Sequence, residues 1–383
     1  MLIALSSTKT RMCSGKLKLS QAAALLLVGS IGCISGCHSA AHTSAVAPSV
    51  ASAPPLLAIL DHFTGSDVPA QGPAEAAPIP HNWPDPTIAP DVPGSGLAQH
   101  PMLYVGEGYN QIFVVNHGKV VWTYSYGKGG EIDDVWMLSN GDILAARQHH
   151  VDEVTPQKQI VWHYDPPEGT EVHTCQPIGL DKVLMVQNGL PPKLLIINKK
   201  TGAIELEHDL PAPSLTDQKT VHPQFRHFRM TAAGTYLAPM LSQNKIVEFD
   251  KNFNPIWTYA IMTPWDAVRL HNGNTLITDE HERLVREVNP KGETVWQFTA
   301  ADFPPNIVSV NPQTAERLAN GDTVIFYSGG GEKKQPYIVQ AVEISPDKKL
   351  VWVLQDWKNL GPATTGQFLD QPGIPEHPGD LQQ

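Results

Sequence analysis

The segment TVHPQFRHFRM, residues 220–230, concentrates the side chains of this sequence that are best suited to chemistry. It contains His222, Arg226, His227 and Arg229. A histidine can act as a general base or a nucleophile near neutral pH, and an arginine binds carboxylates, sulfates and phosphates through paired hydrogen bonds. The same side chains also bond to backbone carbonyls in structural roles. The segment therefore indicates either a binding site for an anionic or polyhydroxylated ligand or a catalytic centre.

A repeated pattern on both sides of this segment indicates which elements hold it in place. A turn signal such as LHNGNTLIT is followed by a phrase such as VREVNPKG and then by a closing phrase such as ETVWQF. An Asn-Gly pair favours a tight hairpin, so each copy predicts four antiparallel strands over roughly 40 residues, the period of a propeller blade. Such a sheet is stable only when neighbouring sheets cover its apolar faces. We expect the side chains at the closing positions to pack between blades; these are Trp122, Trp162, Leu206, Trp257, Trp296 and Trp352.

The two ends of the repeat region predict how the ring of blades closes. The first closing phrase follows only two strand-like runs, at 100–106 and 111–116, and an unpaired run, GPATTGQFLD at 361–370, follows the last one. If that run adds the missing inner strand to the first blade, the ring has no open strand edge. The sequence therefore predicts an all-β fold: a six-bladed β-propeller of four-stranded antiparallel blades, closed by the C-terminal strand. Seven blades are the alternative if 209–224 or 302–316 contains further strands.

The positions just before the inner strands should line one mouth of the central channel. A purely structural channel has no need of histidine, arginine and aspartate together, so we expect a ligand site there. The catalytic candidates are His173, His222, Arg226 and His227. The candidates for ligand contacts are Asp133, Asp134, Gln176, Arg229, Trp265, Asp266 and Glu316.

Two other motifs attract attention but predict no chemistry. Adjacent histidines in RQHH, residues 147–150, would point to opposite faces of a strand, so we predict no metal site. Cys175 lies close to His173, but we expect it to be buried in a strand. Because it is the only cysteine of the mature body, an intrachain disulfide and a multi-cysteine zinc site are excluded there.

The N-terminus has the features of an export signal. A positively charged stretch precedes the apolar run 22–32, and the sequence ISGC then ends at Cys37. This ending resembles the lipobox of bacterial lipoproteins. We predict a lipoprotein signal peptide over 1–36, acylation of Cys37, and a lipid-anchored protein in the bacterial cell envelope, on its periplasmic or outer surface. An ordinary signal peptide with an incidental cysteine is the alternative.

Composition separates a tether from a globular body. Residues 37–98 are rich in alanine, proline, serine and glycine, which predicts a largely disordered tether, in which PPLLAILDHF offers a short docking turn. We place the propeller at 99–383. The net charge of the 383 residues is −11 and no basic stripe follows residue 20, so nucleic acid is not an expected partner.

The repeats resemble two known families of propellers. Their Gly-x-x-x-Trp closings resemble quinoprotein-like repeats, and the form LxNGNxL followed by EVxPxGxxVW is similar to the arylsulfotransferase family, over residues 99–370. The arylsulfotransferase resemblance implies six blades and channel histidines and arginines, one histidine carrying the sulfuryl group; His173, His222, Arg226 and His227 are the candidates. Enzymes that use pyrroloquinoline quinone (PQQ) imply eight blades and a metal-assisted quinone site. The repeat count argues against that cofactor, and we predict none.

The sequence therefore favours a binding function. We predict a monomeric, membrane-anchored propeller that binds a polar or anionic small molecule, a glycan or a protein at the channel mouth. An enzyme of arylsulfate sulfotransferase or carbohydrate-modifying type is one alternative, and a scaffold subunit of a cell-envelope complex is another. Two histidines and an arginine converging on one point would favour an enzyme, and dispersed side chains at a shallow mouth would favour a scaffold.

Overall fold

The computed structural model describes the greater part of the chain, namely residues 56–66, 92–106, 110–127, 130–328 and 338–383. All of these residues belong to the unit 51–383. The predicted signal peptide, Cys37 and most of the predicted tether lie outside the described residues. Within the described ranges, no helix combines the length and the apolar character that crossing a membrane requires.

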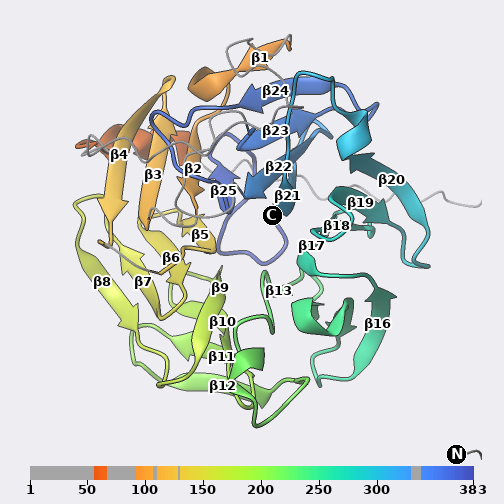
Figure 1. Cartoon of the computed structure of the whole chain (residues 1–383). Helices are drawn as coiled ribbons and strands as arrows, with labels where there is room; N and C mark the ends of the chain where they lie inside the picture. The colour runs from red at the N-terminus through yellow and green to blue at the C-terminus, as the bar shows by residue number, and fades with distance from the viewer. Residues whose placement is uncertain (1–55, 67–91, 107–109, 128–129, 329–337) are drawn as a thin grey trace, which may run out of the picture. The chain divides into compact units, whose positions relative to one another are not determined.

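Six mainly antiparallel sheets are arranged in a ring, whose central axis is called the channel below (Figure 1). The first blade contains β25 (Thr365–Phe368), β2 (Met102–Val105), β3 (Gln111–Asn116) and β4 (Lys119–Ser125). The second contains β5 (Asp134–Met137), β6 (Ile143–Arg147), β7 (His150–Val154) and β8 (Ile160–Tyr164). The third contains β9 (Glu171–Ile178), β10 (Lys182–Asn188), β11 (Lys193–Asn198) and β12 (Ile204–Asp209).

The remaining blades follow in chain order. The fourth contains β13 (Arg229–Met230), β14 (Tyr236–Met240), β15 (Lys245–Phe249) and β16 (Pro255–Ala260). The fifth contains β17 (Pro264–Arg269), β18 (Thr275–Asp279), β19 (Leu284–Val288) and β20 (Thr294–Thr299). The sixth contains β21 (Asn311–Arg317), β22 (Thr323–Ser328), β23 (Ala341–Ile344) and β24 (Leu350–Leu354). Short 3-10 helices connect or flank the blades; they are η1 (Leu56–His62), η2 (Gly96–Ala98), η3 (Gln218–Thr220), η4 (Leu241–Gln243) and η5 (Ala300–Asp302).

The predicted closure of the ring is confirmed. β25 pairs antiparallel with β2, so the C-terminal strand is the inner strand of the first blade. The seven-blade alternative is wrong, because the long connections at 209–224 and 302–316 supply no extra blade. One strand was not predicted: β1 (Gly94–Ser95), which precedes residue 99 and pairs in parallel with β24 at the outer edge of the sixth blade.

The Asn-Gly turns lie between the first and second strands of their blades. In the turn between β5 and β6, Gly141 N donates to Leu138 O (2.9 Å) and Leu138 N donates to Asp142 O (2.8 Å). Gly141 has a φ of +91°, a backbone conformation that a residue with a Cβ rarely adopts. The loop therefore holds three residues, and its glycine provides the positive φ.

The closing tryptophans connect neighbouring blades. Three of these indoles donate a hydrogen bond to a proline carbonyl in the last turn of the next blade, and the indole of Trp352 donates to Gly96 O, so the ring gains polar contacts as well as buried apolar area. The pairs are Trp122 Nε1 to Pro156 O (2.8 Å), Trp257 Nε1 to Pro290 O (3.1 Å) and Trp296 Nε1 to Pro346 O (3.1 Å).

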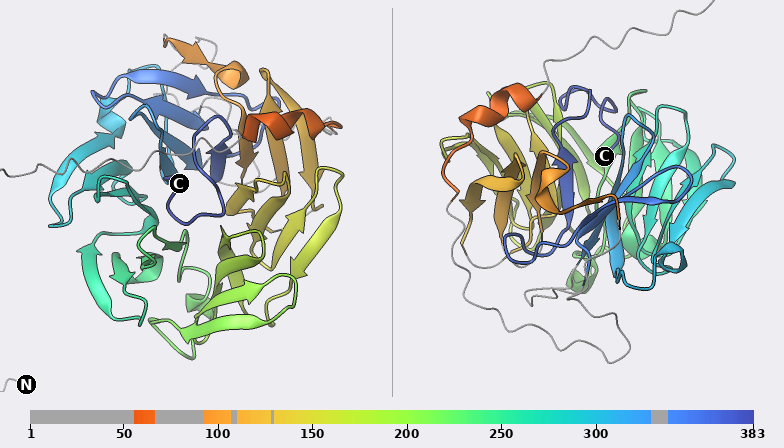
Figure 2. Two further views of the ribbon diagram at one scale, coloured as in Figure 1. Left: turned by 180° about the vertical axis from the view of Figure 1, so that it is seen from behind. Right: turned by 90° about the horizontal axis from the view of Figure 1, so that it is seen from above.

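Residues 371–383, here called the C-terminal tail, cross one mouth of the channel. Figure 2 shows this tail in dark blue, on the same face of the ring as η1. It bonds to hairpin turns of four blades: Ser139 N donates to Glu376 Oε1 (2.6 Å), Gly179 N to Glu376 O (2.9 Å), His271 N to Gln382 Oε1 (2.8 Å) and Arg317 N to Gln382 O (3.0 Å). We call this end of the channel the tail mouth.

The apolar stretch proposed as a docking turn packs against the first two blades. It forms η1, whose Leu56 and Leu60 are buried in a cluster with residues of those blades. Phe63 meets the ring of Trp122 edge-on, with the ring centroids 5.4 Å apart. The segment therefore covers apolar surface that the first closing tryptophan would otherwise leave open.

Candidate functional site

Polar side chains of the inner strands bond to the backbone of the next blade. Such bonds satisfy backbone groups that face the channel, where neighbouring sheets are not joined by a ladder of their own. Four pairs illustrate this arrangement: Met137 N donates to Gln367 Oε1 (2.7 Å), Cys175 N to Asp134 Oδ2 (2.9 Å), Met230 N to Gln176 Oε1 (2.7 Å) and Ala315 N to Asp266 Oδ2 (3.1 Å).

Five of the predicted ligand contacts take part in this buried framework. Arg229 donates to both carboxylate oxygens of Asp134, at 2.6 and 3.0 Å, and so joins the fourth blade to the second. Burial raises the pKa of the Glu316 carboxyl well above its usual range. With Gln176 and Asp266, these side chains are all buried. Their bonds hold blades together, and their role as ligand contacts stays a prediction.

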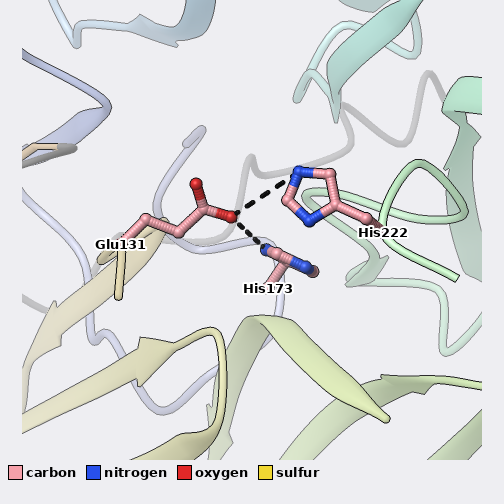
Figure 3. A group of neighbouring side chains, drawn as sticks. All are labelled: Glu131, His173 and His222. Atoms are coloured by element: carbon pink, nitrogen blue, oxygen red, sulfur yellow. Dashed lines mark ion pairs between the residues drawn. The ribbon is translucent and has the colours of Figure 1, made fainter. Parts of the chain in front are cut away.

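A second polar group gathers where the inner strands of the second and third blades begin (Figure 3). His173 Nδ1 lies 2.5 Å from Asp133 Oδ2 and 3.2 Å from Glu131 Oε1. On the other side of the ring, His173 Nε2 lies 2.8 Å from Glu171 Oε2. Three carboxylates thus surround one fully buried imidazole.

The connection that leads into β13 adds His222 and Arg226 to this group. His222 Nδ1 lies 2.8 Å from Glu171 Oε2, and its Nε2 lies 3.1 Å from Arg226 Nη2. Arg226 also donates to His222 O (2.6 Å), and its guanidinium carbon lies 4.7 Å from the ring centroid of Trp265. Glu131, Asp133, Glu171, His173, His222 and Arg226 are called the mouth cluster below, and the end of the channel that they line is called the histidine mouth.

The charges of the mouth cluster are strongly coupled. Burial and Arg226 lower the pKa of His173, but its bonds to Asp133, Glu131 and Glu171 outweigh them and raise that pKa to about 10. Burial raises the pKa of Glu131, yet His173 outweighs this effect and lowers it to about 2. Burial also raises the pKa of Asp133, so Asp133 and His173 compete for one proton. With that proton on His173, the cluster holds three carboxylates, one imidazolium and one guanidinium, which leaves one negative charge.

Several buried polar atoms around the mouth cluster have no hydrogen-bond partner within the described part of the chain. They are Asp133 Oδ1, Arg226 Nε and Trp265 Nε1. Leaving a buried polar atom unpaired costs roughly 1 to 3 kcal/mol, so such atoms are normally satisfied by water, an ion or a ligand. Their number in one place indicates a site that accepts another species.

The structure separates the four predicted catalytic residues. His173, His222 and Arg226 lie together, but His227 does not share their position: its Nε2 donates to Asp133 O (2.7 Å) and its Nδ1 accepts from Arg229 Nη2 (2.9 Å). His173 is likewise enclosed by its carboxylate partners. Only His222 reaches solvent, with 50 % of its side chain exposed.

Sequence reasoning missed Glu131 and Glu171, which complete the cluster. Each lies two positions before a predicted residue, Asp133 or His173. Side chains two apart on an extended chain point to the same face, so the phrases EIDD and EVHT contained the signal.

A separate group of possible metal ligands lies at the edge of the second blade. His150, His163 and Asp165 bring their ligand atoms within 4.8 Å of one another. His163 Nδ1 is hydrogen-bonded to the buried Asp152. The adjacent histidines of RQHH do not reveal this group, because His150 meets His163 across two neighbouring strands, with the ring centroids 5.2 Å apart. Cys175, as predicted, is buried in a strand.

Comparisons with known proteins support the fold. No family model and no curated protein matches the chain. A crystal structure of a protein of unknown function from Bacteroides caccae is 25% identical, covers 70% of this chain and 98% of its own, and superposes with a TM-score of 0.61. Virginiamycin B lyase from Staphylococcus aureus is 12% identical and covers 66% of this chain and 84% of its own, with a TM-score of 0.45. The superposition with the Bacteroides caccae structure supports the overall fold, and the resemblance to quinoprotein-like repeats and arylsulfotransferases stays a prediction.

Proposed function

We propose that this protein is an exported, lipid-anchored β-propeller that binds a small polar ligand at the histidine mouth. The observation that carries the proposal is His222, whose half-exposed ring is held by Glu171 at one nitrogen and by Arg226 at the other. A ligand would therefore meet an oriented imidazole that is backed by buried charged groups. A few convergent polar groups of this kind fix the orientation of ligands in protein sites.

The charge of the mouth cluster supports a neutral polyhydroxylated ligand, such as a sugar, or a cationic one. Arg226 and His222 alone would suit a sulfate or a carboxylate. Glu131 and Glu171 change this balance, because the cluster holds more carboxylates than cationic groups. An anionic ligand would be repelled, whereas sugar hydroxyls can donate to the carboxylates.

Export and anchoring are supported by the N-terminal sequence, in which an apolar run leads to Cys37. Replacing Cys37 with serine should abolish incorporation of labelled palmitate when the full chain is expressed in a bacterium. Equal labelling of the wild type and the Cys37→Ser variant would contradict the proposed lipid anchor.

A thermal-shift screen tests the ligand proposal. Neutral sugars, amino sugars and sugar acids should be compared, and we expect the neutral and amino sugars to raise the unfolding midpoint. His222→Ala should abolish the shift, while His377→Ala, which changes an exposed histidine of the C-terminal tail, should retain it. If no sugar shifts the wild type, or if both variants respond alike, the proposal fails.

Catalysis is a second candidate, because Glu171 and His222 have the geometry of a carboxylate that orients a general base. His222 Nδ1 faces Glu171, so the lone pair on Nε2 can accept a proton once a substrate displaces Arg226 from that nitrogen. Hydrolysis of nitrophenyl glycosides and transfer from nitrophenyl sulfate to phenol are the assays. We expect any turnover to fall at least about 100-fold in His222→Ala, and turnover that survives this change would exclude His222 as the base.

A further inference from the structure

We propose that the histidine mouth is a site for a divalent transition metal ion of the zinc type, with Glu131, His173 and His222 as its ligands. This inference deepens the proposed function, because a metal with an open coordination position would give a polar ligand its point of attachment. The ligand atoms of the three residues lie within 4.8 Å of one another.

The distances fit a metal with only small adjustments. Glu131 Oε1 lies 3.2 Å from His173 Nδ1 and 3.9 Å from His222 Nε2 (Figure 3). Ligand atoms that each bind a tetrahedral zinc ion at about 2.0 to 2.1 Å are separated by roughly 3.3 Å. A point between these three atoms is therefore within reach of all of them.

Glu171 provides the strongest argument, because one of its oxygens faces both histidines. Oε2 lies 2.8 Å from His173 Nε2 and 2.8 Å from His222 Nδ1. If both nitrogens donate to it, the opposite nitrogens, His173 Nδ1 and His222 Nε2, are the ones left for a metal. The ion must then displace the proton that His173 Nδ1 shares with Asp133 and the contact of Arg226 with His222 Nε2. Metal-binding histidines commonly donate their second nitrogen to a carboxylate, which fixes the tautomer and orients the ring.

An unpaired buried oxygen is the second, independent indication of a ligand. Asp133 is fully buried, and its Oδ1 has no hydrogen-bond partner among the described residues. Its other oxygen already faces His173 Nδ1. Asp133 can therefore supply a fourth ligand or accept from a water molecule on the metal.

Arg226 opposes the metal and should limit its affinity. Arg226 Nη2 lies 3.1 Å from His222 Nε2, the nitrogen that the metal needs. The contact can be broken without releasing Arg226, because its Nη1 remains bonded to His222 O (2.6 Å) and Phe225 O (3.1 Å). We expect binding in the micromolar range and not the much tighter binding of a closed structural zinc site.

Cobalt(II) is the probe for the test, because its visible absorption reports nitrogen and oxygen ligation at low coordination number. Metal-free protein carrying His150→Ala, which disables the group at the edge of the second blade, should bind one equivalent of Co²⁺ with visible bands, and Zn²⁺ should displace it. Adding His222→Ala or Glu131→Gln should weaken binding at least about 10-fold, in line with the effect of losing one ligand group. His377→Ala is the matched control and should change nothing.

Three outcomes would overturn the metal site: no Co²⁺ binding in the His150→Ala protein at 100 µM, binding that survives both mouth variants, or binding in the wild type that His150→Ala alone removes. The sugar screen, repeated with a chelator, separates this inference from the proposed function. If sugars still raise the unfolding midpoint in the presence of the chelator and the protein binds no Co²⁺, the sugar site remains supported and the metal site is excluded.

Discussion

At the scale of single residues, the channel contains two kinds of polar side chain that differ in what they face. Asp134 and Arg229 satisfy each other through two hydrogen bonds and are buried. His222 keeps half of its side chain in solvent. The first kind holds the ring together, whereas the second is available to a ligand, and this difference decides what a mutation should do.

Replacing Asp134 with asparagine should strongly destabilise the protein. The change leaves the buried guanidinium of Arg229 without its counter-charge, and breaking a buried pair from one side costs about 3 to 5 kcal/mol. Urea denaturation followed by tryptophan fluorescence measures the loss. Glu205→Gln, which breaks the exposed Lys182–Glu205 pair at 2.6 Å, is the control and should leave the urea midpoint almost unchanged. Equal effects of the two changes would show that Asp134 is not a structural partner.

The sequence indicated the residues of the channel better than their roles. Both an inter-blade bond and a ligand contact require a polar side chain at the start of an inner strand, so Asp266 and His222 could not be told apart by residue type. Which partner each side chain meets depends on the angle between blades, and no local pattern encodes that angle. Glu171 became recognisable only when the chain around it brought two histidines to the same oxygen.

At the scale of elements, the repeated strands were predictable and the segments outside the repeat were less so. Periodic apolar residues and Asn-Gly turns predicted the blades, and the leftover C-terminal run predicted β25. β1 and the C-terminal tail belong to no repeat. Their positions depend on surfaces that exist only after the ring has formed, such as the edge of β24 and the hairpin turns at the tail mouth.

Two truncations should separate the roles of β25 and the C-terminal tail. A chain that ends after Asp370 keeps β25 and loses the tail, so it should still unfold cooperatively, with a lower midpoint because Glu376 and Gln382 no longer bond to the hairpin turns. A chain that ends after Leu360 also loses β25, which exposes the edge of β2 and should abolish the cooperative transition. Circular dichroism during heating distinguishes the two. If both truncated chains unfold alike, β25 is not what closes the ring.

At the scale of the whole molecule, the ring has one seam, where the first and the sixth blades meet. His100 lies in this seam and, when protonated, forms an ion pair with a carboxylate on each side. Its Nε2 lies 3.0 Å from Glu343 in β23, and its Nδ1 lies 3.5 Å from Asp370, which follows β25. Its ring also contacts Trp352 and Phe368, with centroid distances of 5.2 and 4.6 Å. The closure of the whole ring therefore contains one buried titratable group between two carboxylates.

The stability of the ring should depend on pH through His100. Burial lowers the pKa of His100, but Asp370 and Glu343 outweigh it and raise the pKa from 6.5 to about 9. A pKa raised by folding gives stabilisation that is complete below the unfolded value of 6.5 and is lost as the pH rises to about 9. The full effect is on the order of 3 kcal/mol.

His100→Gln should therefore unfold at a much lower urea concentration than the wild type near pH 6, and the difference between the two urea midpoints should narrow towards pH 10. His377→Gln should follow the wild type throughout. A gap between wild type and His100→Gln that stays constant across this range would show that His100 contributes packing and no charge to the seam.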